Sequence, residues 1–239
     1  MIRFTSVAIA ALLAGACNVG ADAEERDAGP EVSRNYQVGA FDKIAVAGPY
    51  EVTVVTGGQP GVSAKGGQNL LEETDVIVED GTLKIMPKKH KGIRWNWSNG
   101  KAVFTVNAAA LRGAAIAGSG GISVDKVAGD FDGDVAGSGD LRLASVAGGK
   151  IKLAIAGSGD VSAAGKAESV DLSIAGSGDI NAGGLASQTA DVSIAGSGNI
   201  TANASASADV SIMGSGDVEV TGGAKCTVSK HGSGNVRCS

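Results

Sequence analysis

The tripeptide Gly-Ser-Gly recurs seven times between residues 114 and 238, and this repeat constrains the fold more than any other feature of the sequence. The steps between successive copies are 19, 20, 19, 20, 18 and 18 residues. The copies begin at Gly118, Gly137, Gly157, Gly176, Gly196, Gly214 and Gly232. So regular a period is typical of an architecture in which each repeat forms one structural unit.

Short apolar stretches flank the corners with a period of two residues. Ile or Val stands two residues before the first Gly at Ile116, Val135, Ile155, Ile174, Ile194 and Ile212. Two residues after the last Gly stand Ile122, Leu141, Val161, Ile180, Ile200, Val218 and Val236. Alternation of this kind predicts short strands with one buried face, so each repeat is a strand, a Gly corner, a second strand and a looser turn.

A strand of four or five residues cannot bury its apolar face alone. Stacking the repeats about 4.8 Å apart pairs their backbones and seats each Ile or Val on its counterpart in the next repeat. The sequence therefore predicts an all-β chain in which residues 114–239 form a parallel β-solenoid, a single-stranded parallel β-helix with one repeat in each coil.

Residues 36–113 lack the repeat and hold most of the aromatic residues, so we expect an irregular β region that caps the solenoid. Within it, Glu79-Asp80-Gly81-Thr82 lies between two short apolar stretches and predicts a hairpin.

The first residues indicate export. Residues 1–16 have a basic start, an apolar core and a small-residue end, which is typical of a secretory signal peptide, and a second cut is open after Ala23. Cys17 follows the sequence Leu13-Ala14-Gly15-Ala16, an imperfect lipobox, so lipidation at Cys17 and simple secretion both stay open. Residues 17–35 are polar and acidic, and we expect a tether.

The two remaining cysteines flank the last Gly-Ser-Gly, with Cys226 six residues before Gly232 and Cys238 four residues after Gly234. In an exported chain this spacing favours a disulfide that closes the final coil over two free thiols.

The chain also resembles a known family. Four of its segments are similar to the N-terminal pattern of the bacterial GIN domain. They are the start Phe41-Asp42-Lys43-Ile44, the segment Gly48-Pro49-Tyr50-Glu51-Val52, the turn Asn69-Leu70-Leu71 and the hairpin Asp80-Gly81-Thr82-Leu83. The ladder of Gly-Ser-Gly-Asp corners is similar to the C-terminal half of that family, once a domain of unknown function and described as an autotransporter adhesin head. The resemblance covers residues 36–238 and implies a right-handed parallel β-helix, with no catalytic residues to carry over.

An Asp or Asn follows six of the corners, at Asp140, Asp160, Asp179, Asn199, Asp217 and Asn235. These side chains stabilise turns by bonding nearby backbone N–H groups, which is the interpretation we favour. The alternative is a cation site whose weak candidates are Asp140, Asp160, Asp179 and Asp217. One carboxylate in each coil is few for Ca²⁺, which takes ~6–8 oxygen ligands.

A second candidate is the segment from Lys88 to Trp97, which holds both Trp residues of the chain. Its candidate ligand-binding residues are Lys88, Lys89, Arg94, Trp95 and Trp97. Two indoles at i and i+2 on a strand, beside cations, would suit sugar rings, anionic glycans or phospholipid head groups. The alternative is a basic loop whose Trp pair packs over the end of the solenoid.

Catalysis and nucleic-acid binding are disfavoured. The sequence has no His-Glu-x-x-His, Gly-x-Ser-x-Gly or phosphate-loop motif, and the corner Ser residues lack base partners in the sequence. The solenoid carries 13 acidic and 8 basic residues, a charge unsuited to nucleic acid. We therefore predict a non-catalytic binding or structural protein of the bacterial envelope, periplasmic, on the outer membrane or at the cell surface, whose partner is an envelope protein or glycan. No cofactor is expected, and a lipid anchor at Cys17 is the one membrane attachment that the sequence leaves open. A polysaccharide lyase or hydrolase on a β-helix is the alternative.

The mature N-terminus tests the export interpretation. We expect mass spectrometry of the chain purified from bacterial envelopes to give either a diacylglyceryl-modified Cys17 or a free N-terminus at Cys17 or Glu24. An N-terminus that retains Met1 would contradict export.

Overall fold

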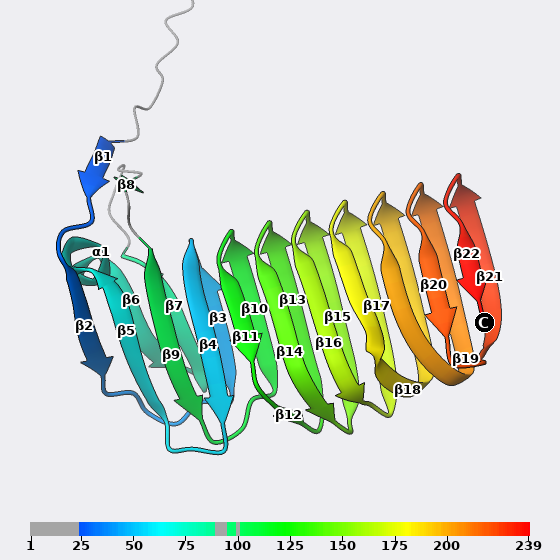
Figure 1. Cartoon of the computed structure of the whole chain (residues 1–239), viewed down its shortest axis with the longest axis horizontal. Coiled ribbons are helices and arrows are strands. Elements are labelled where there is room, and N and C mark those ends of the chain that lie inside the picture. The colour runs from blue at the N-terminus through cyan, green and yellow to red at the C-terminus, as the bar shows by residue number, and fades with distance from the viewer. Residues whose placement is uncertain (1–23, 89–94, 99–100) are drawn as a thin grey trace, which may run out of the picture.

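The computed structural model describes residues 24–88, 95–98 and 101–239. The chain winds through successive coils that stand side by side along one long axis (Figure 1). From residue 113 onward, each coil has a strand that leads into a Gly-Ser-Gly corner and a strand that leaves it, and like strands of successive coils pair in parallel. The predicted all-β fold with stacked parallel strands is confirmed.

The strands that lead into corners form one face, which we call the pre-corner face. In stacking order it contains β7 (Thr82–Pro87), β3 (Lys43–Ala47), β10 (Gly113–Gly118), β13 (Phe131–Gly137), β15 (Lys150–Gly157), β17 (Ser169–Gly176), the second half of β18 (Asp179–Gly196), the second half of β19 (Ile200–Gly214) and β21 (Lys225–Gly232).

The strands that leave the corners form the opposite face, the post-corner face. In stacking order it contains β9 (Ala102–Ala108), β4 (Tyr50–Thr56), β11 (Gly121–Val124), β14 (Asp140–Ala147), β16 (Asp160–Lys166), the first halves of β18 and β19, β20 (Val218–Thr221) and β22 (Val236–Cys238). The short β12 (Val127–Ala128) also pairs with β14.

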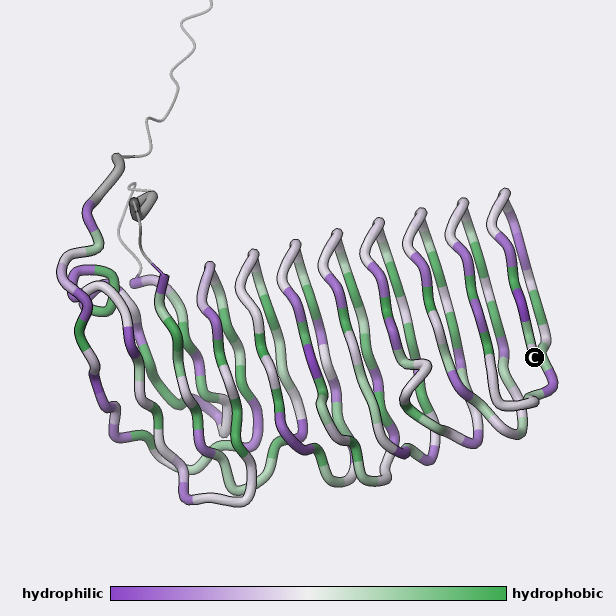
Figure 2. The backbone as a smooth tube through the Cα atoms, in the orientation of Figure 1, coloured by the Kyte–Doolittle hydropathy of each residue, from purple (hydrophilic) through white to green (hydrophobic). Residues whose placement is uncertain are grey.

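The core lies between the two faces. The predicted Ile and Val column before the corners stacks in register, so that Ile155 lies between Val135 and Ile174. Members of this column from Ile116 to Ile212 are at most 3 % exposed. Figure 2 shows the resulting alternation of hydrophobic and hydrophilic residues along each coil. Burying one such side chain stabilises the fold by about 1.5–3 kcal/mol, and each coil repeats that gain.

The corners stack as closely as the strands do. Ser158 donates its backbone N–H to the Gly137 carbonyl at 2.8 Å, and Ser177 donates in the same way to Gly157 at 2.8 Å. The first Gly of each corner has φ between 122° and 142°. A Cβ on Gly176 would lie 2.1 Å from the Gly157 carbonyl oxygen, and a Cβ on Gly178 would lie 2.1 Å from that of Gly159. Both glycines are therefore required, the first for its φ and both for the contact between coils.

The coil stack begins within residues 36–113. β3 and β4 form a coil whose corner is Gly48-Pro49, and the Gly48 N–H donates to the Ala117 carbonyl at 2.9 Å. A further coil, β7 with β9, lies on the other side of β3 and β4. The coil of β3 and β4 therefore lies between two coils that follow it in the chain. The coil of β7 and β9 lies on one side of it, and β10 pairs with β3 on the other side (Figure 1).

Antiparallel strands and a short helix cover this end. β2 (Glu31–Tyr36) pairs with β5 (Gly61–Gly67), and β5 pairs with β9. β6 (Thr74–Glu79) and β7 form the predicted hairpin, in which Asp80 and Gly81 have positive φ. The helix α1 (Gln68–Glu72), which the sequence analysis did not predict, buries Leu70 and Leu71.

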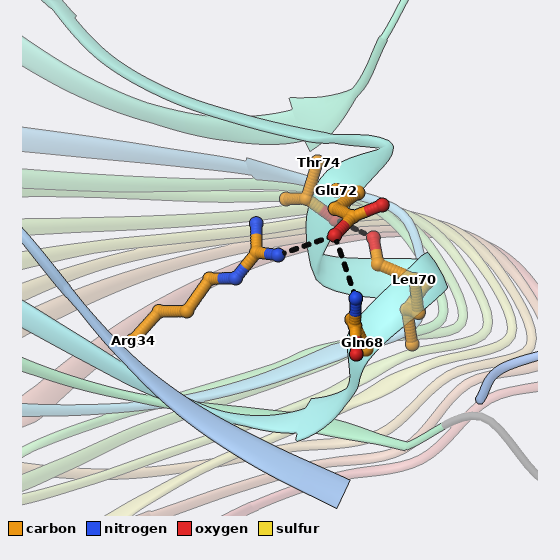
Figure 3. A network of polar contacts seen from close by, with 5 residues as sticks. All are labelled: Arg34, Gln68, Leu70, Glu72 and Thr74. Atoms are coloured by element: carbon orange, nitrogen blue, oxygen red, sulfur yellow. Dashed lines mark hydrogen bonds and ion pairs between the residues drawn. The ribbon is translucent and has the colours of Figure 1, made fainter. Parts of the chain in front are cut away.

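A polar network fixes α1 to its neighbours (Figure 3). Arg34 on β2 donates to the Glu72 carboxylate at 2.7 Å, and Gln68 donates to the same oxygen at 3.1 Å. The hydrogen bond from Gln68, followed by that from Arg34, lowers the pKa of the Glu72 carboxyl. The Thr74 hydroxyl donates to the Leu70 carbonyl at 2.8 Å and lies 3.0 Å from the Tyr50 hydroxyl. Burial raises the pKa of the Tyr50 hydroxyl.

At the other end of the stack, a disulfide joins Cys226 on β21 to Cys238 on β22. The bond links the two faces of the last coil, as the spacing of the two cysteines led us to expect.

Three Gly→Ala variants separate the two demands on glycine. Gly178→Ala meets a backbone oxygen without a left-handed φ, and we expect it to lower the free energy of unfolding by about 3 kcal/mol. Gly148→Ala, with φ 81° and open space around the added methyl, should cost about 1–2 kcal/mol. Gly184→Ala, whose nearest neighbour would be 3.4 Å away, is the control and should be neutral or stabilising by up to about 1 kcal/mol. Urea titration measures all three, and a Gly178→Ala variant as stable as the parent would contradict the corner contact.

Candidate functional site

The outward side chains of the pre-corner face are small or acidic on β17 and on the second halves of β18 and β19, except for Met213, whereas the neighbouring β15 carries Lys150 and Lys152. Three successive coils repeat one outward pattern of Asp, Ser and a small or apolar residue, and the three copies stack in register. We call the polar part of this pattern the Asp-Ser array; it consists of Asp171, Ser173, Asp191, Ser193, Asp209 and Ser211. A shallow open groove runs over this face, lined by Ala154, Ala156, Ser173, Ala175, Ser193 and Ala195. Over the Asp-Ser array the surface is flat, because on this face β17, β18 and β19 present no large outward side chain except Met213, which is 68 % exposed.

The post-corner face is more polar. Next to the column of Asp and Asn runs an outward column of mixed polar and charged residues, in register from coil to coil. Its members are Thr53, Ser123, Arg142, Ser162, Asn181, Thr201, Glu219 and Arg237. Arg237 lies 4.0 Å from the Glu219 carboxylate, an exposed pair that contributes little to stability.

The Asp and Asn column forms a ladder of hydrogen bonds between coils. The Asp179 side-chain oxygen accepts from the Asn199 backbone N–H at 2.8 Å and from its side-chain amide at 2.9 Å. The Asn199 side-chain oxygen accepts from the Asp217 N–H at 3.1 Å, so an amide can fill the same place. Asp217 accepts in turn from the Asn235 N–H at 2.7 Å. The predicted bonding to backbone N–H groups is present, but it joins neighbouring coils instead of closing a turn within one coil.

This ladder engages the side chains that we considered as cation ligands. Asp140 accepts from the Asp160 N–H at 3.2 Å, and Asp160 accepts from the Asp179 N–H at 3.3 Å. Among the described residues, no group of three or more His, Cys, Asp or Glu side chains lies close enough to hold a metal ion.

The Trp segment takes the place of a corner. β7 stacks on β3 and β9 stacks on β4, so the residues between Pro87 and Ala102 are inserted where the next coil has Gly48-Pro49. Lys88 is exposed, and its backbone N–H donates to the Glu73 carbonyl at 2.8 Å. The predicted ligand-binding residues Lys89 and Arg94 lie outside the described residues.

Trp95 and Trp97 belong to β8 (Trp95–Ser98), which the structure describes by its backbone. β8 pairs in parallel with β1 (Glu24–Asp27), with Trp95 opposite Glu24 and Trp97 opposite Arg26. These strands form a separate two-stranded sheet at the N-terminal end of the stack (Figure 1). The sequence analysis treated residues 17–35 as a tether and missed this pairing, because polar residues carry no strand periodicity. Cys17, the predicted lipidation site, lies outside the described residues.

A groove lined by carboxylates and aromatic side chains on one face would favour a polysaccharide lyase or hydrolase. Within the described ranges, no aromatic side chain lies outward on a coil after Phe131, which is itself buried. His231 is exposed next to the last corner, and none of the hydrogen bonds in the described part of the chain joins it to a Ser hydroxyl. A smooth face of Ser, Asp, Asn and Lys is what we expect of an interaction module.

Substitutions at Asp179 test whether the ladder is structural. Asp179→Ala removes the acceptor of two hydrogen bonds and should lower the free energy of unfolding by about 1–3 kcal/mol. Asp179→Asn keeps an acceptor and should cost less, and Ca²⁺ should leave the melting temperature of the parent chain unchanged. A Ca²⁺-dependent rise in melting temperature that Asp179→Asn abolishes would instead make the column a cation site.

Part of the chain can be compared with solved structures. A crystal structure from Parabacteroides distasonis described as a "putative lipid binding protein" is 26% identical, with a TM-score of 0.76, and covers 90% of this chain and 100% of its own. A "putative adhesin" from Bacteroides fragilis is also 26% identical, with a TM-score of 0.78 and the same coverage. A "putative adhesin" from Parabacteroides merdae, 20% identical with a TM-score of 0.67 over 91% of this chain and 100% of its own, shares the fold. No curated protein has a sequence that matches this chain.

The described residues contain no helix with the length and hydropathy needed to cross a membrane. The sequence profile of one family, described as "Putative auto-transporter adhesin, head GIN domain", matches residues 40–224. This match spans β3 to β20, with the segment between β7 and β9 and six of the seven Gly-Ser-Gly corners, and it agrees with the resemblance seen in the sequence. The chain belongs to the GIN domain family.

Proposed function

We propose that this protein is an exported, non-catalytic binding protein of the bacterial envelope that presents the pre-corner face to a glycan. Membership of a family of adhesin heads supports a binding role, and the signal-like N-terminus supports export. The flat stack supports a partner that is itself extended, because a convex or compact ligand would touch few coils.

The Asp-Ser array is the observation that carries this proposal. Its carboxylates and hydroxyls recur with the strand spacing of about 4.8 Å over three coils, in register. Carboxylates accept hydrogen bonds from sugar hydroxyls, and Ser hydroxyls both donate and accept. The Ala side chains of the neighbouring column leave room for a ring to lie against the sheet. A repeating ligand can then meet identical groups in successive coils, and weak contacts add along its length.

A pair of Ser→Arg variants tests which face binds. Ser193→Arg places a bulky cation within the Asp-Ser array, whereas Ser162→Arg places it on the post-corner face at a Ser of similar exposure. We expect Ser193→Arg to weaken binding to bacterial surface glycans on an array, and to insoluble peptidoglycan in co-sedimentation, by at least tenfold. Ser162→Arg should bind like the parent. Equal binding by all three proteins, or no binding to either probe, would contradict the proposal.

A lipid surface is the second candidate partner. One of the similar structures carries a lipid-binding description, and both Trp residues lie on β8 beside the strand nearest the N-terminus. Trp at such a position suits a membrane interface, and the basic residues between Lys88 and Arg94 suit anionic head groups. Co-sedimentation with vesicles of phosphatidylethanolamine and phosphatidylglycerol separates the candidates, because the double variant Trp95→Ala/Trp97→Ala would lose vesicle binding and keep glycan binding.

A further inference from the structure

The last coil of the stack, β21 with β22, differs from every coil before it. One edge of β21 pairs with β19 and one edge of β22 pairs with β20. Among the described residues, no strand pairs with the opposite edges, so their backbone N–H and C=O groups are available to another chain. At the other end of the stack, α1 and the antiparallel strands cover the core instead.

The inner columns change their chemistry in this coil. Lys230 takes the place that Ile212 holds in the previous coil, and Cys226 takes that of Ala208. The Lys230 ammonium donates to the Gly234 carbonyl at 2.7 Å, across the end of the coil, and the Cys226–Cys238 disulfide joins its two faces. A further coil stacked in register would bury this ammonium in an apolar column, which costs several kcal/mol for an unpaired charge. The solenoid itself therefore stops here.

The core column nevertheless remains partly open at this end. Val228 continues the column of Val210, but Val228 is 47 % exposed where Val210 is 3 % exposed. An apolar side chain on an added strand would cover Val228 as Val228 covers Val210. The edge of β21 is eight residues long, enough for a strand to pair along it.

Charge decides which strand fits this edge. The last coil carries Lys225, Lys230 and Arg237 together with His231, and residues 220–239 contain no Asp or Glu. Two copies meeting at these edges would bring like charges together, which opposes self-pairing and is a usual protection of edge strands. An acidic strand would be attracted by the same charges, so the edge discriminates between partners by sign.

We propose that the free edge of β21 is an interaction surface that binds an extended acidic segment of a partner protein by strand addition. On its inward side, the partner segment carries an apolar residue over Val228 and a carboxylate over the Lys230 ammonium. On its outward side it carries carboxylates that lie with Lys225 and His231. Backbone hydrogen bonds supply affinity, and the placement of these side chains supplies specificity. This surface is separate from the Asp-Ser array, so either can exist without the other.

The test uses the full chain with its disulfide intact and a fluorescein-labelled eight-residue peptide of Glu, with Val only at the two positions that would cover Cys226 and Val228. Fluorescence anisotropy should show saturable binding, and a peptide with Lys in place of Glu should bind at least tenfold more weakly. A peptide N-methylated at alternate residues keeps its charge but loses its backbone donors, and it should also lose at least tenfold in affinity. Hydrogen exchange should show new protection in β21.

Lys225→Glu should weaken binding of the acidic peptide at least tenfold. Lys150→Glu is the matched control, because Lys150 starts β15 in the same column of the stack but lies inside it, and it should bind like the parent. Thermal melting confirms that both variants are folded. The proposal is overturned if no peptide binds, if N-methylation has no effect, or if protection maps away from β21. Self-association that Lys225→Glu abolishes would also overturn it, since the occupant would then be a second copy of this chain.

Discussion

The backbone contact between stacked corners is the constraint on which the rest of this structure depends. In each corner the first Gly has a left-handed φ, and its carbonyl oxygen accepts the N–H of the next corner's Ser. The second Gly approaches the carbonyl of the preceding corner so closely that a methyl group has no room. Because the corners are held together, the strands on both faces keep their register. Each Ile or Val then stacks on its counterpart in the next coil.

Different residues stabilise the stack and form its exposed surface. The inner columns, the corners and the Asp and Asn ladder hold successive coils together, and they repeat with little variation. The outward columns are not needed for stacking, so they can carry the Asp-Ser array on one face and mixed charges on the other. A rigid scaffold with freely variable outward columns suits the family's description as an adhesin head, because recognition can change without loss of the fold.

The sequence analysis predicted the repeat region well and the N-terminal region in part. The columns through Ile155 and Leu141 are buried as expected, because alternation with a period of two reports directly on which face is inside. The hairpin at Asp80 and Gly81 also follows from local turn chemistry. Helix α1 did not, since five residues carry no helical period. The ladder through Asp179 was expected within a turn, because spacing along a sequence cannot show that the nearest N–H belongs to the next coil.

The sequence by itself determined that the chain would form stacked coils, because seven Gly corners at one period, each flanked by alternating apolar residues, leave no other way to bury those residues. Tertiary structure alone decided the order of the coils at the N-terminal end, where β7 and β9 lie outside β3 and β4 although they follow them in the chain. It also decided that β8, between β7 and β9, pairs with residues 24–27. The physical reason is that these strands pair with whichever strand edge the folded chain leaves unpaired. The position of an unpaired edge depends on the whole fold and cannot be read from spacing along the sequence.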